Sequence, residues 1–587
     1  MATIASYIAS RLKELGCAHV FGVPGTSCSD FFSTVDATAG IDAVVTANEL
    51  EAGYAADGYA RFTGFGTCCV AYGVGTLSAI NALAGSLVER VPVLMLNGGP
   101  SQQELDDQAQ YGVLFSHSTG RPELDFRLFR EISVGAHVIS ATENIPQAID
   151  DLLRTAVESW GPVYLEVPND LWLMSIADPS GSLLQPSSPT PSPIFPGFLD
   201  MAIQKAEGAQ SPVFLLGVEL VRKGLRDDAL DMIEATGYPF ATTVLSKSII
   251  DESHPQFQGT YDTDLVVKPV RELLESSDCL IALGCVFGVD HLTLIKGQYS
   301  QMINVAFGEG RIDGAPFPEI DVELFLQQFR PQAKAKASRA SRPYPDRYAQ
   351  RRASWVPKTR DQDAGTQLTH EILFTTVDDF LRESGEPWMT VLDTCLGSFP
   401  GADLVMHGEH VYGANPVWLS IGHGTPAGNG VYFATQKRPL IISGDGGFQM
   451  VVQSVSTMVK YQIPAILVLI DNGAYSIEQY LIDSCFFVRP EQTLLPFVGL
   501  NSWNYENMPA LFGGGQGVKV QSGTEFRAAL DAALLVTDGP SIISAQIPTN
   551  DLPPENVPFA EDQCSDPLAE KAVSTRWHLP TTHRRRR

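Results

Sequence analysis

The sequence contains few basic residues and no long uninterrupted apolar run. Lys and Arg total 40 against 67 Asp and Glu, so the formal net charge at pH 7 is −27. An acidic chain of this kind is a poor match for nucleic acid or for an anionic membrane surface. No apolar run approaches the roughly 20 residues that a membrane-spanning helix needs. We therefore expect a soluble, cytoplasmic protein with neither a nucleic-acid partner nor a membrane partner.

Cysteine is scarce in this chain of 587 residues and shows no pairing pattern. The nine cysteines are odd in number, contain no C-x-x-C spacing and often stand in apolar segments. A disulfide framework or a structural zinc site has a more regular cysteine pattern. We therefore expect reduced, buried thiols at Cys17, Cys28, Cys68, Cys69, Cys279, Cys285, Cys395, Cys485 and Cys564.

The first residues also lack the continuous apolar core of a signal peptide. Apolar side chains instead recur at positions 4, 7, 8, 12 and 15. This spacing is typical of one face of an α-helix. We therefore expect an amphipathic helix at the start of the chain.

Two breaks in composition divide the chain into three blocks. The Pro- and Ser-rich segment 178–198 and the basic segment 331–355 lack periodic apolar patterns, as extended interdomain crossings do. A chain of this length is too long for a single core. We expect domains at 1–178, 199–330 and 360–560, followed by a polar tail at 561–587.

Each block alternates short β-branched runs with helical stretches. This alternation is typical of parallel sheets covered by helices. The expected fold class is therefore α/β, with three doubly wound parallel-sheet domains. The expected strands are HVFGVPG, AVVTA, TCCVAYG, VPVLMLNG and PVYLEVP in the first block, PVFLLG, PFATTVL, CLIALG and MINVAF in the second, and WMTVLD, PLIISGDGG, PAILVLIDN and SIISAQIP in the third.

The third block contains a strand that ends in Gly-Asp-Gly-Gly at 444–447. One helical stretch follows, and the next strand, AILVLI, exits into Asp471 and Asn472. In a right-handed βαβ crossover both strand ends lie at the same edge of the sheet, where open α/β sheets bind ligands. We therefore expect Asp445 and Asn472 to lie side by side. Alone, Gly-Asp-Gly favours the alternative of an ordinary strand-to-helix turn with an Asp N-cap.

The side chains at these two strand ends are those that a hard cation prefers. An Asp oxygen, an Asn oxygen and a nearby main-chain carbonyl supply half of an octahedral Mg²⁺ shell, which phosphate oxygens and water complete. Glycines let backbone amides approach a ligand closely, and the amides after Gly446 can help to hold the same phosphates. We therefore expect a magnesium diphosphate site.

The segments GDGGFQM and DNGAYSIEQ together resemble the diphosphate-anchoring motif of thiamine diphosphate (ThDP) enzymes. The chain is similar to the pyruvate and indolepyruvate decarboxylases from residue 1 to about residue 560. The resemblance implies three domains: an N-terminal pyrimidine-binding domain, a central domain and a diphosphate-binding domain. It also implies that Mg²⁺ is held by Asp445, Asn472 and the carbonyl of Ala474, with Gly444, Gly446 and Gly447 at the diphosphate.

The first block contains NELEAGYAADGYAR, which is similar to the helix that activates the cofactor in these decarboxylases. A Glu in a first helical turn can also serve the helix dipole alone. The resemblance implies that Glu49 exchanges a proton with N1′ of the aminopyrimidine, a role favoured by burial, which raises a carboxyl pKa. Glu51 should lie on an exposed face. In the family this carboxylate and the metal site come from different subunits, so a homodimer, often doubled to a homotetramer, is implied.

Two further segments of the third block resemble cofactor-contacting loops. In WLSIGHGTPAG, Ile421 would bend the cofactor, and the carbonyl of Leu419 would accept a hydrogen bond from its 4′-amino group. An ordinary core position is the alternative for Ile421, and His423 either borders the pocket or packs. The segment LDTCLGS resembles a second diphosphate-contacting loop, which adds Thr394 and Cys395 to the cofactor-binding residues.

The residues expected at the substrate follow the family in part. Glu478, on the helix behind the metal site, matches the Glu that handles the substrate carboxylate and protonates the intermediate in related decarboxylases. The family's Asp in the first strand turn and its His-His pair are replaced by Thr26 and by Ser116 before a single His117, an arrangement similar to benzoylformate decarboxylase and benzaldehyde lyase. A hydroxyl donates hydrogen bonds but is not a general base near pH 7, whereas His is one.

With the resemblance, these residues predict a carbon–carbon lyase that decarboxylates a 2-oxo acid non-oxidatively through a carbanion-enamine. Because the acid relay is altered, this intermediate should live longer, and carboligation with an aldehyde or a second 2-oxo acid to an acyloin should compete. The alternatives are a dedicated carboligase, related to acetolactate synthase or benzaldehyde lyase, and a catalytically silent scaffold. No Gly-x-Gly-x-x-Gly points to FAD or NAD.

Overall fold

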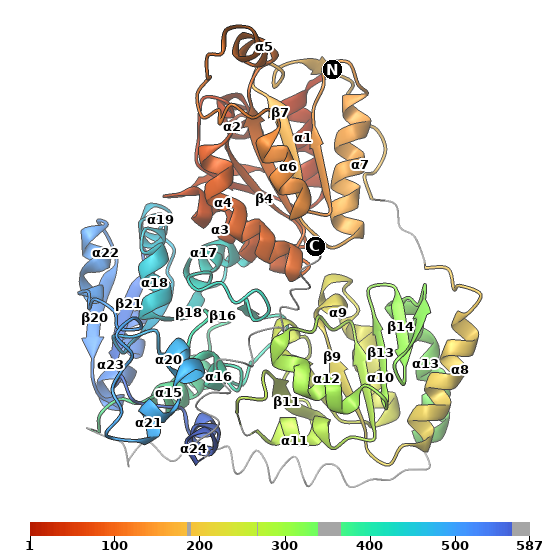
Figure 1. Ribbon diagram of the computed structural model, residues 1–587, viewed down its shortest axis with the longest axis vertical. Coiled ribbons are helices and arrows are strands. Elements are labelled where there is room, and N and C mark those ends of the chain that lie inside the picture. The colour runs from red at the N-terminus through yellow and green to blue at the C-terminus, as the bar shows by residue number, and fades with distance from the viewer. Residues whose placement is uncertain (185–188, 267, 338–365, 566–587) are drawn as a thin grey trace, which may run out of the picture.

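The computed structural model describes residues 1–184, 189–266, 268–337 and 366–565. These residues form three large sheets flanked by helices, and one short two-stranded sheet. In Figure 1 the first domain lies at the top, the third at the lower left and the central domain at the lower right. The mostly parallel α/β architecture predicted from the sequence is confirmed. Across the described ranges, no helix combines the length and apolarity needed to cross a membrane.

The first domain contains a parallel six-stranded sheet with the order β3-β2-β4-β5-β7-β6. Its central strand β5 is buried along its whole length, as a strand covered on both faces must be. The strands are β2 (His19–Gly22), β3 (Asp42–Val45), β4 (Gly66–Ala71), β5 (Val93–Gly99), β6 (Gly135–Val138) and β7 (Val163–Pro168), while β1 (Ala2–Thr3) pairs separately with β8 (Ser175–Ile176). The helices are α1 (Ile4–Glu14), α2 (Ser29–Asp36), α3 (Glu49–Thr63), α4 (Val74–Val88), α5 (Gln102–Tyr111), α6 (Leu124–Glu131) and α7 (Ile145–Glu158).

The predicted amphipathic helix at the start of the chain is confirmed. Helix α1 is capped by Thr3, whose side chain accepts a hydrogen bond from the backbone nitrogen of Ser6. This cap satisfies one of the free amides of the first turn. The apolar stripe expected from the spacing is buried against the first sheet: Ile4, Tyr7, Ile8, Leu12 and Leu15.

The central domain contains a seven-stranded sheet with the order β11-β10-β9-β12-β13-β14-β15. Its last two strands are antiparallel. The strands are β9 (Pro212–Leu216), β10 (Phe240–Thr243), β11 (Phe257–Tyr261), β12 (Cys279–Leu283), β13 (Met302–Ala306), β14 (Glu309–Ile312) and β15 (Ala315–Pro318). The helices are α8 (Phe195–Gly208), α9 (Val218–Arg222), α10 (Arg226–Thr236), α11 (Pro269–Glu275), α12 (Leu292–Gln298) and α13 (Val322–Ala337).

The segment 331–355, expected to be extended, begins as a helix. Helix α13 continues to Ala337, because the small and long-chain residues of this stretch are good helix formers. Residues 338–355 lie outside the described residues. The expectation of an extended crossing is therefore wrong for its first part.

The third domain contains a parallel six-stranded sheet with the order β17-β16-β18-β19-β21-β20. The strands are β16 (Met389–Leu392), β17 (Tyr412–Ala414), β18 (Pro439–Gly444), β19 (Ile466–Asp471), β20 (Gln516–Val520) and β21 (Ser541–Gln546). The helices are α15 (His370–Glu383), α16 (Ser398–Gly401), α17 (Gly424–Thr435), α18 (Asp445–Val451), α19 (Ser454–Lys460), α20 (Ser476–Ile482), α21 (Cys485–Val488), α22 (Met508–Leu511), α23 (Gly523–Ala533) and α24 (Val557–Ser565).

The β18–β19 connection, predicted as one helix, is divided into two. Helix α18 ends at Val451 and α19 begins at Ser454. The two β-branched residues at the break, Val451 and Val452, have restricted side chains that lower helix propensity. The crossover is otherwise as predicted, since Phe448, Val451 and Met458 are buried.

The first and third domains are packed together through α3 and α17 (Figure 1). Glycines allow the close approach, because a Cβ on Gly58 would lie 2.4 Å from the carbonyl oxygen of Ala427. Likewise, a Cβ on Gly430 would lie 1.9 Å from the carbonyl oxygen of Ala55. Any larger residue at either position would force the helices apart.

The expectation that all nine cysteines are reduced is wrong for two of them. Cys485 in α21 forms a disulfide with Cys564 in α24, 79 positions later. The other seven cysteines are free and buried. The pairing was not visible in the sequence because the two residues meet only when α24 folds back over α20 and α21, which places Phe559 against Tyr480.

Candidate active site

The exits of β18 and β19 are joined by the side chain of Asp445. The two strands run parallel with Gly444 opposite Ile470, so both end at the same edge of the sheet. Asp445 Oδ2 accepts a hydrogen bond of 2.7 Å from the backbone nitrogen of Gly473, and its Oδ1 accepts one of 2.8 Å from that of Gly446. The predicted proximity of Asp445 to the Asn472 turn is confirmed.

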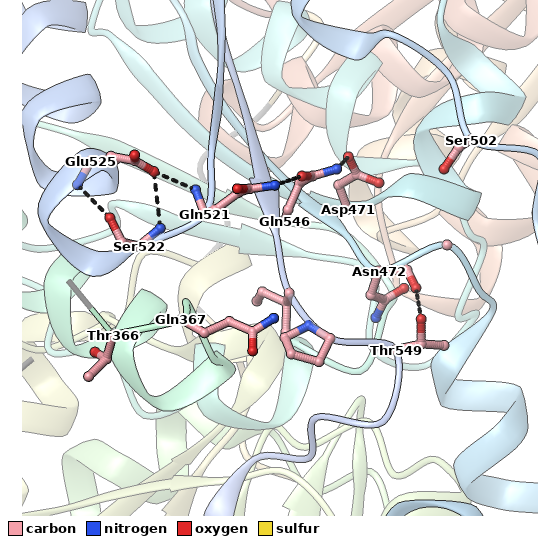
Figure 2. Close-up of a pocket in the computed structure, with 13 residues that line it drawn as sticks. Thr366, Gln367, Asp471, Asn472, Ser502, Gln521, Ser522, Glu525, Gln546 and Thr549 are labelled. Atoms are coloured by element: carbon pink, nitrogen blue, oxygen red, sulfur yellow. Dashed lines mark hydrogen bonds between the residues drawn. The ribbon is translucent and has the colours of Figure 1, made fainter.

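Asn472 is held in the turn that follows β19. Its side-chain oxygen accepts a hydrogen bond of 3.3 Å from the backbone nitrogen of Ala474. Its carbonyl accepts one of 2.7 Å from the hydroxyl of Thr549, which Figure 2 shows beside it. A cavity of about 750 Å³ borders this turn and is lined mainly by polar side chains, among them Gln367, Ser502, Gln521, Glu525 and Gln546.

The donor set at this edge fits a hard cation. Burial is the main cause that raises the pKa of Asp445 to about 7; the hydrogen bond from the amide of Gly473 lowers this pKa, and the charge of Asp471 raises it. A divalent cation would offset this clustering of negative charge. No group of three or more His, Cys, Asp or Glu side chains suited to a metal occurs among the described residues. One carboxylate assisted by amide and carbonyl oxygens is instead a donor set that suits Mg²⁺.

Four glycines form a cradle beside Asp445. A Cβ on Gly446 would lie 2.4 Å from the ring of Tyr475, and one on Gly447 would lie 2.9 Å from Asp393 Oδ2. Gly422, with φ of +87°, would place a Cβ 2.8 Å from the carbonyl oxygen of Gly447, and one on Gly444 would lie 3.0 Å from Cβ of Cys395. These four positions therefore require glycine, because a side chain at any of them would collide with the segments packed around Asp445.

Asp393 is a site residue that the sequence reasoning missed. It is buried at the end of β16 and accepts hydrogen bonds from Ser443 Oγ at 2.7 Å, from the backbone nitrogen of Thr394 at 2.9 Å and from that of Gly422 at 3.1 Å. Burial raises its pKa. Asp393 thereby ties the segment with Thr394 and Cys395 to the segment with Ile421. An Asp directly after a buried strand, as at Asp445, was the available signal.

The loop before α17 presents the two residues expected at the cofactor ring. Leu419 has a left-handed backbone, with φ of +58°, and is 41% exposed. Ile421 is half-buried. A left-handed non-glycine residue is strained and persists only where its surroundings hold it. Because Leu419 is both strained and exposed, its conformation is compatible with a contact to a ligand or to a second chain.

Glu49 begins α3 at the carboxyl edge of the first sheet. The cap is Asn48, whose side chain accepts a hydrogen bond from the backbone nitrogen of Glu51. Glu49 is half-buried, and its Oε1 would lie 3.5 Å from a Cβ on Gly75. The side chain therefore lies over the turn that begins α4.

The expectation that Glu51 is exposed is wrong. Glu51 is 0% exposed, and its Oε2 accepts a hydrogen bond of 2.9 Å from the backbone nitrogen of Ala47. Its Oε1 lies 3.4 Å from the side-chain nitrogen of Asn429 in the third domain. Burial raises the pKa of Glu51. The third domain covers a helix face that would otherwise meet solvent.

The remaining first-domain candidates lie near Glu49. His117 has φ of +67°, and its carbonyl oxygen would lie 2.6 Å from a Cβ on Gly73. Glu49 and His117 therefore flank the turn between β4 and α4. Thr26 follows β2, the neighbour of β4. Thr26, Ser116 and His117 are exposed in the single chain, as is Glu478 on α20.

The three domains match three profiles of one enzyme family. The N-terminal TPP binding domain of thiamine pyrophosphate enzymes matches residues 2–119, the central domain matches 199–322 and the C-terminal TPP binding domain matches 403–545. These ranges contain both Glu49 and the pair Asp445 and Asn472.

Curated relatives are similar over most of the chain. The pyruvate decarboxylases of Candida glabrata and Kluyveromyces lactis are each 30% identical, over 496 and 497 residues, which cover 82% of this chain and 84% of each relative. Pyruvate decarboxylase isozyme 1 of Saccharomyces cerevisiae is 29% identical over 497 residues, with the same coverage. The chain belongs to the family of thiamine diphosphate-dependent 2-oxo acid decarboxylases.

Proposed function

We propose that this protein binds ThDP and Mg²⁺, decarboxylates a 2-oxo acid and also joins the product to an acceptor carbonyl. The observation that carries the proposal is the junction of Asp445 with the Asn472 turn beside a cradle of glycine backbone. This junction offers hard oxygen donors at the carboxyl edge of a parallel sheet, where open α/β sheets bind ligands.

Asp445, Asn472 and the carbonyl of Ala474 would hold Mg²⁺. Gly444, Gly446 and Gly447 would border the diphosphate, together with Thr394 and Cys395. Asp393 supports the proposal, because it fixes the backbone at Gly422 and Thr394 on both sides of this space. Bound ThDP supplies a nucleophilic carbon for the substrate carbonyl and accepts electrons when CO₂ leaves.

Glu49 would exchange a proton with the aminopyrimidine of the cofactor. A carboxyl group suits this task when it is shielded from water. Glu49 is only half-buried in the single chain, so a further surface must complete its environment. The apolar side chains of Val74 and Leu77, 54% and 37% exposed beside this turn, support such a covering surface.

A second copy of the chain is the covering surface that we propose. Glu49, Thr26 and His117 face outward from the first domain, while Leu419 and Glu478 face outward from the third. Two copies related by a twofold axis would pair each first domain with the third domain of its partner. The active unit is therefore a homodimer, or a homotetramer made of two such dimers.

The substrate end of the site would deliver protons slowly. Thr26 and Ser116 donate hydrogen bonds to a carboxylate or carbonyl oxygen but do not take up protons near pH 7. His117 and Glu478 then remain as the acid–base groups. Because fewer acids surround the product carbon, an acceptor aldehyde or a second 2-oxo acid has more time to react there, which yields an acyloin.

A dedicated carboligase is the second candidate, favoured by the same hydroxyl residues Thr26 and Ser116. A catalytically silent scaffold is disfavoured, since Glu49, Asp445, Asn472 and Glu478 are all present. The seven free cysteines favour a location in the reducing cytoplasm, although the disulfide between Cys485 and Cys564 does not.

Two measurements test the proposal. Titration with ThDP and Mg²⁺, followed by circular dichroism, should show saturable binding, and its absence would favour the scaffold. Pyruvate, phenylpyruvate and benzoylformate should then be assayed in parallel for CO₂, with and without acetaldehyde or benzaldehyde. We expect both aldehyde and acyloin. If only aldehyde forms, even with excess acceptor, the protein does not catalyse carboligation. If only acyloin forms, the protein is a dedicated carboligase.

A further inference from the structure

The loop from 415 to 423, named here the cofactor loop, connects β17 to α17 and contains Leu419 and Ile421. Its backbone is strained at Leu419, which has φ of +58°, while Gly422 adopts φ of +87° at no steric cost. Asp393 holds it from within the third domain through the backbone nitrogen of Gly422. The other strong contacts to this loop come from the first domain of the same chain.

Glu89 of the first domain binds the start of the cofactor loop. Its Oε1 accepts hydrogen bonds from the backbone nitrogens of Val417 at 2.8 Å and Trp418 at 3.1 Å. Glu89 is 0% exposed. The ring of Trp418 is held as well, because its Nε1 donates a hydrogen bond of 2.9 Å to Asn81 Oδ1 on α4. A buried carboxylate with two consecutive amides is a strong and directional anchor.

Arg61 connects Glu89 to the strand before the loop. Its Nη2 donates a hydrogen bond of 2.7 Å to Glu89 Oε2, and its Nη1 donates one of 2.9 Å to the carbonyl oxygen of Ala414. Its Nε donates a third, of 2.6 Å, to Asp57 Oδ1. The fixed fork of the guanidinium thus holds three groups in one plane, which a lysine cannot do.

Asp57 binds the end of the cofactor loop. The Nε2 atom of His423 lies 2.8 Å from Asp57 Oδ1, and Ser86 Oγ donates a hydrogen bond of 2.8 Å to Asp57 Oδ2. Burial opposes the charge of Asp57, but Arg61 and His423 hold its pKa below the usual value. All of these groups are buried, so loss of one charge would leave the others unpaired in a region that water does not reach.

We propose that Glu89 and Arg61 are positioning residues, which place Leu419 and Ile421 against the cofactor. The inference rests on the proposed function, because the cofactor loop matters only if ThDP binds beside it. The contacts lie on both sides of Leu419 and Ile421, at Ala414, Val417, Trp418 and His423, and leave these two residues free to meet a ligand. Helix α3 thereby serves two sites, since Glu49 begins it and Arg61 lies near its end.

The proposal is tested with Glu89→Gln in the full-length protein. Glutamine keeps the shape and one acceptor but loses the charge that pairs with Arg61. We expect ThDP to bind more weakly. We expect kcat to fall by about ten- to a hundredfold, because a small misplacement of reacting groups has this cost. The KM for the 2-oxo acid should change less than about twofold, because no substrate contact is lost. The matched control is Glu14→Gln, a carboxylate on α1 that pairs with Arg11 at 2.6 Å.

A second variant covers the case in which Glu89→Gln fails to fold. Arg61→Lys keeps the positive charge but loses the three-way geometry, and we expect the same selective loss of kcat and ThDP affinity. Normal ThDP affinity and kcat in a folded variant would overturn the positioning role. Equal losses in Glu14→Gln would also overturn it, because the effect would then be general. If the unmodified protein binds no ThDP, both this inference and the proposed function fail.

Discussion

Asp445 Oδ2 accepts a hydrogen bond of 2.7 Å from the backbone nitrogen of Gly473. This bond closes the edge of the third sheet by linking the exits of β18 and β19. It also orients the Asp445 carboxylate toward the turn that carries Asn472. A cation bound at this edge would meet the carboxylate of one strand exit and the amide of the next.

Asp445→Asn should abolish the Mg²⁺ dependence of ThDP binding. The substitution keeps the size of the side chain but removes the negative charge that attracts a divalent cation. We expect the ThDP dissociation constant to rise by at least about a hundredfold, the upper end of what the loss of a supporting residue costs a metal site. Titration by circular dichroism measures it, and Asp538→Asn, in an exposed loop, is the matched control. Retained Mg²⁺-dependent binding would place the metal elsewhere.

Glu49→Gln should bind ThDP but activate it poorly. Glutamine cannot exchange a proton with the aminopyrimidine, so deuterium exchange at C2 of the bound cofactor should slow by about 10²- to 10⁴-fold. Glu51→Gln is the comparison, because Glu51 lies in the first turn of the same helix but contacts Ala47 and Asn429. This second variant should lower thermal stability and leave the exchange rate nearly unchanged. If Glu51→Gln instead slowed the exchange at C2 and Glu49→Gln did not, Glu51 would be the residue that activates the cofactor.

Ser116→His should shift the products from acyloin toward aldehyde. The substitution restores a pair of His residues with His117 and so adds a group that donates a proton near pH 7. We expect the ratio of acyloin to aldehyde to fall by about tenfold or more, as measured by gas chromatography with excess acceptor aldehyde. Ser140→His, at an exposed position of the same domain, should have no effect. An unchanged ratio in Ser116→His would show that proton delivery does not decide the product.

Cys564→Ser should loosen α24 from α20 and α21. The disulfide with Cys485 closes a loop of 79 positions, and its loss should cost about 2–4 kcal/mol of local stability. Hydrogen exchange of α24 measures the change. A reducing agent should produce the same effect in the unmodified protein and none in the variant. Equal protection of α24 in all samples would mean that the two sulfurs are not bonded in solution.

Glu166→Gln should flatten the dependence of stability on pH. Burial raises the pKa of Glu166 from 4.5 to about 7. The folded protein therefore holds this proton more tightly than the unfolded chain, so the contribution to stability is fully present below about pH 4.5 and is lost as the pH rises through about 7. This pKa shift of Glu166 corresponds to about 3 kcal/mol in the free energy of unfolding.

Thermal midpoints between pH 5 and pH 8 test this dependence. The unmodified protein should lose stability more steeply than Glu166→Gln across this range. Glu158→Gln, at an exposed position of α7, should follow the unmodified protein. A variant slope as steep as that of the unmodified protein would assign the dependence to other carboxyl groups.

Much of the third-domain site could be derived from local patterns. A buried β-run followed by Gly-Asp-Gly-Gly and a second run ending in Asp471-Asn472 require a parallel crossover, and the handedness of such crossovers places both exits together. The interior strands were predicted for the same reason, because burial on both faces leaves a continuous apolar run. Of the missed strands, β6, β11, β15, β17 and β20 lie at sheet edges, where exposure dilutes that signal. The missed strand β14 is interior, but its residues are only partly buried, so it has no continuous apolar run.

The contacts between domains could not be derived in this way. Glu51 meets Asn429 and Asp57 meets His423 across separations of 378 and 366 positions, and no periodicity connects segments so far apart. Which face of α3 is buried depends on how two completed domains dock. That docking depends on the shape of whole surfaces, such as the glycine contact between Gly58 and Ala427.

The sequence by itself therefore determined the α/β fold class, the main parallel strands, the family resemblance and the identity of the chemical groups, since these depend on short-range spacing and side-chain chemistry. Only the tertiary structure decided that Glu51 is buried, that Cys485 bonds to Cys564, and that Asp57, Arg61 and Glu89 hold the cofactor loop. These facts depend on the relative placement of rigid bodies, which is encoded in many weak contacts distributed over the chain and in no single motif.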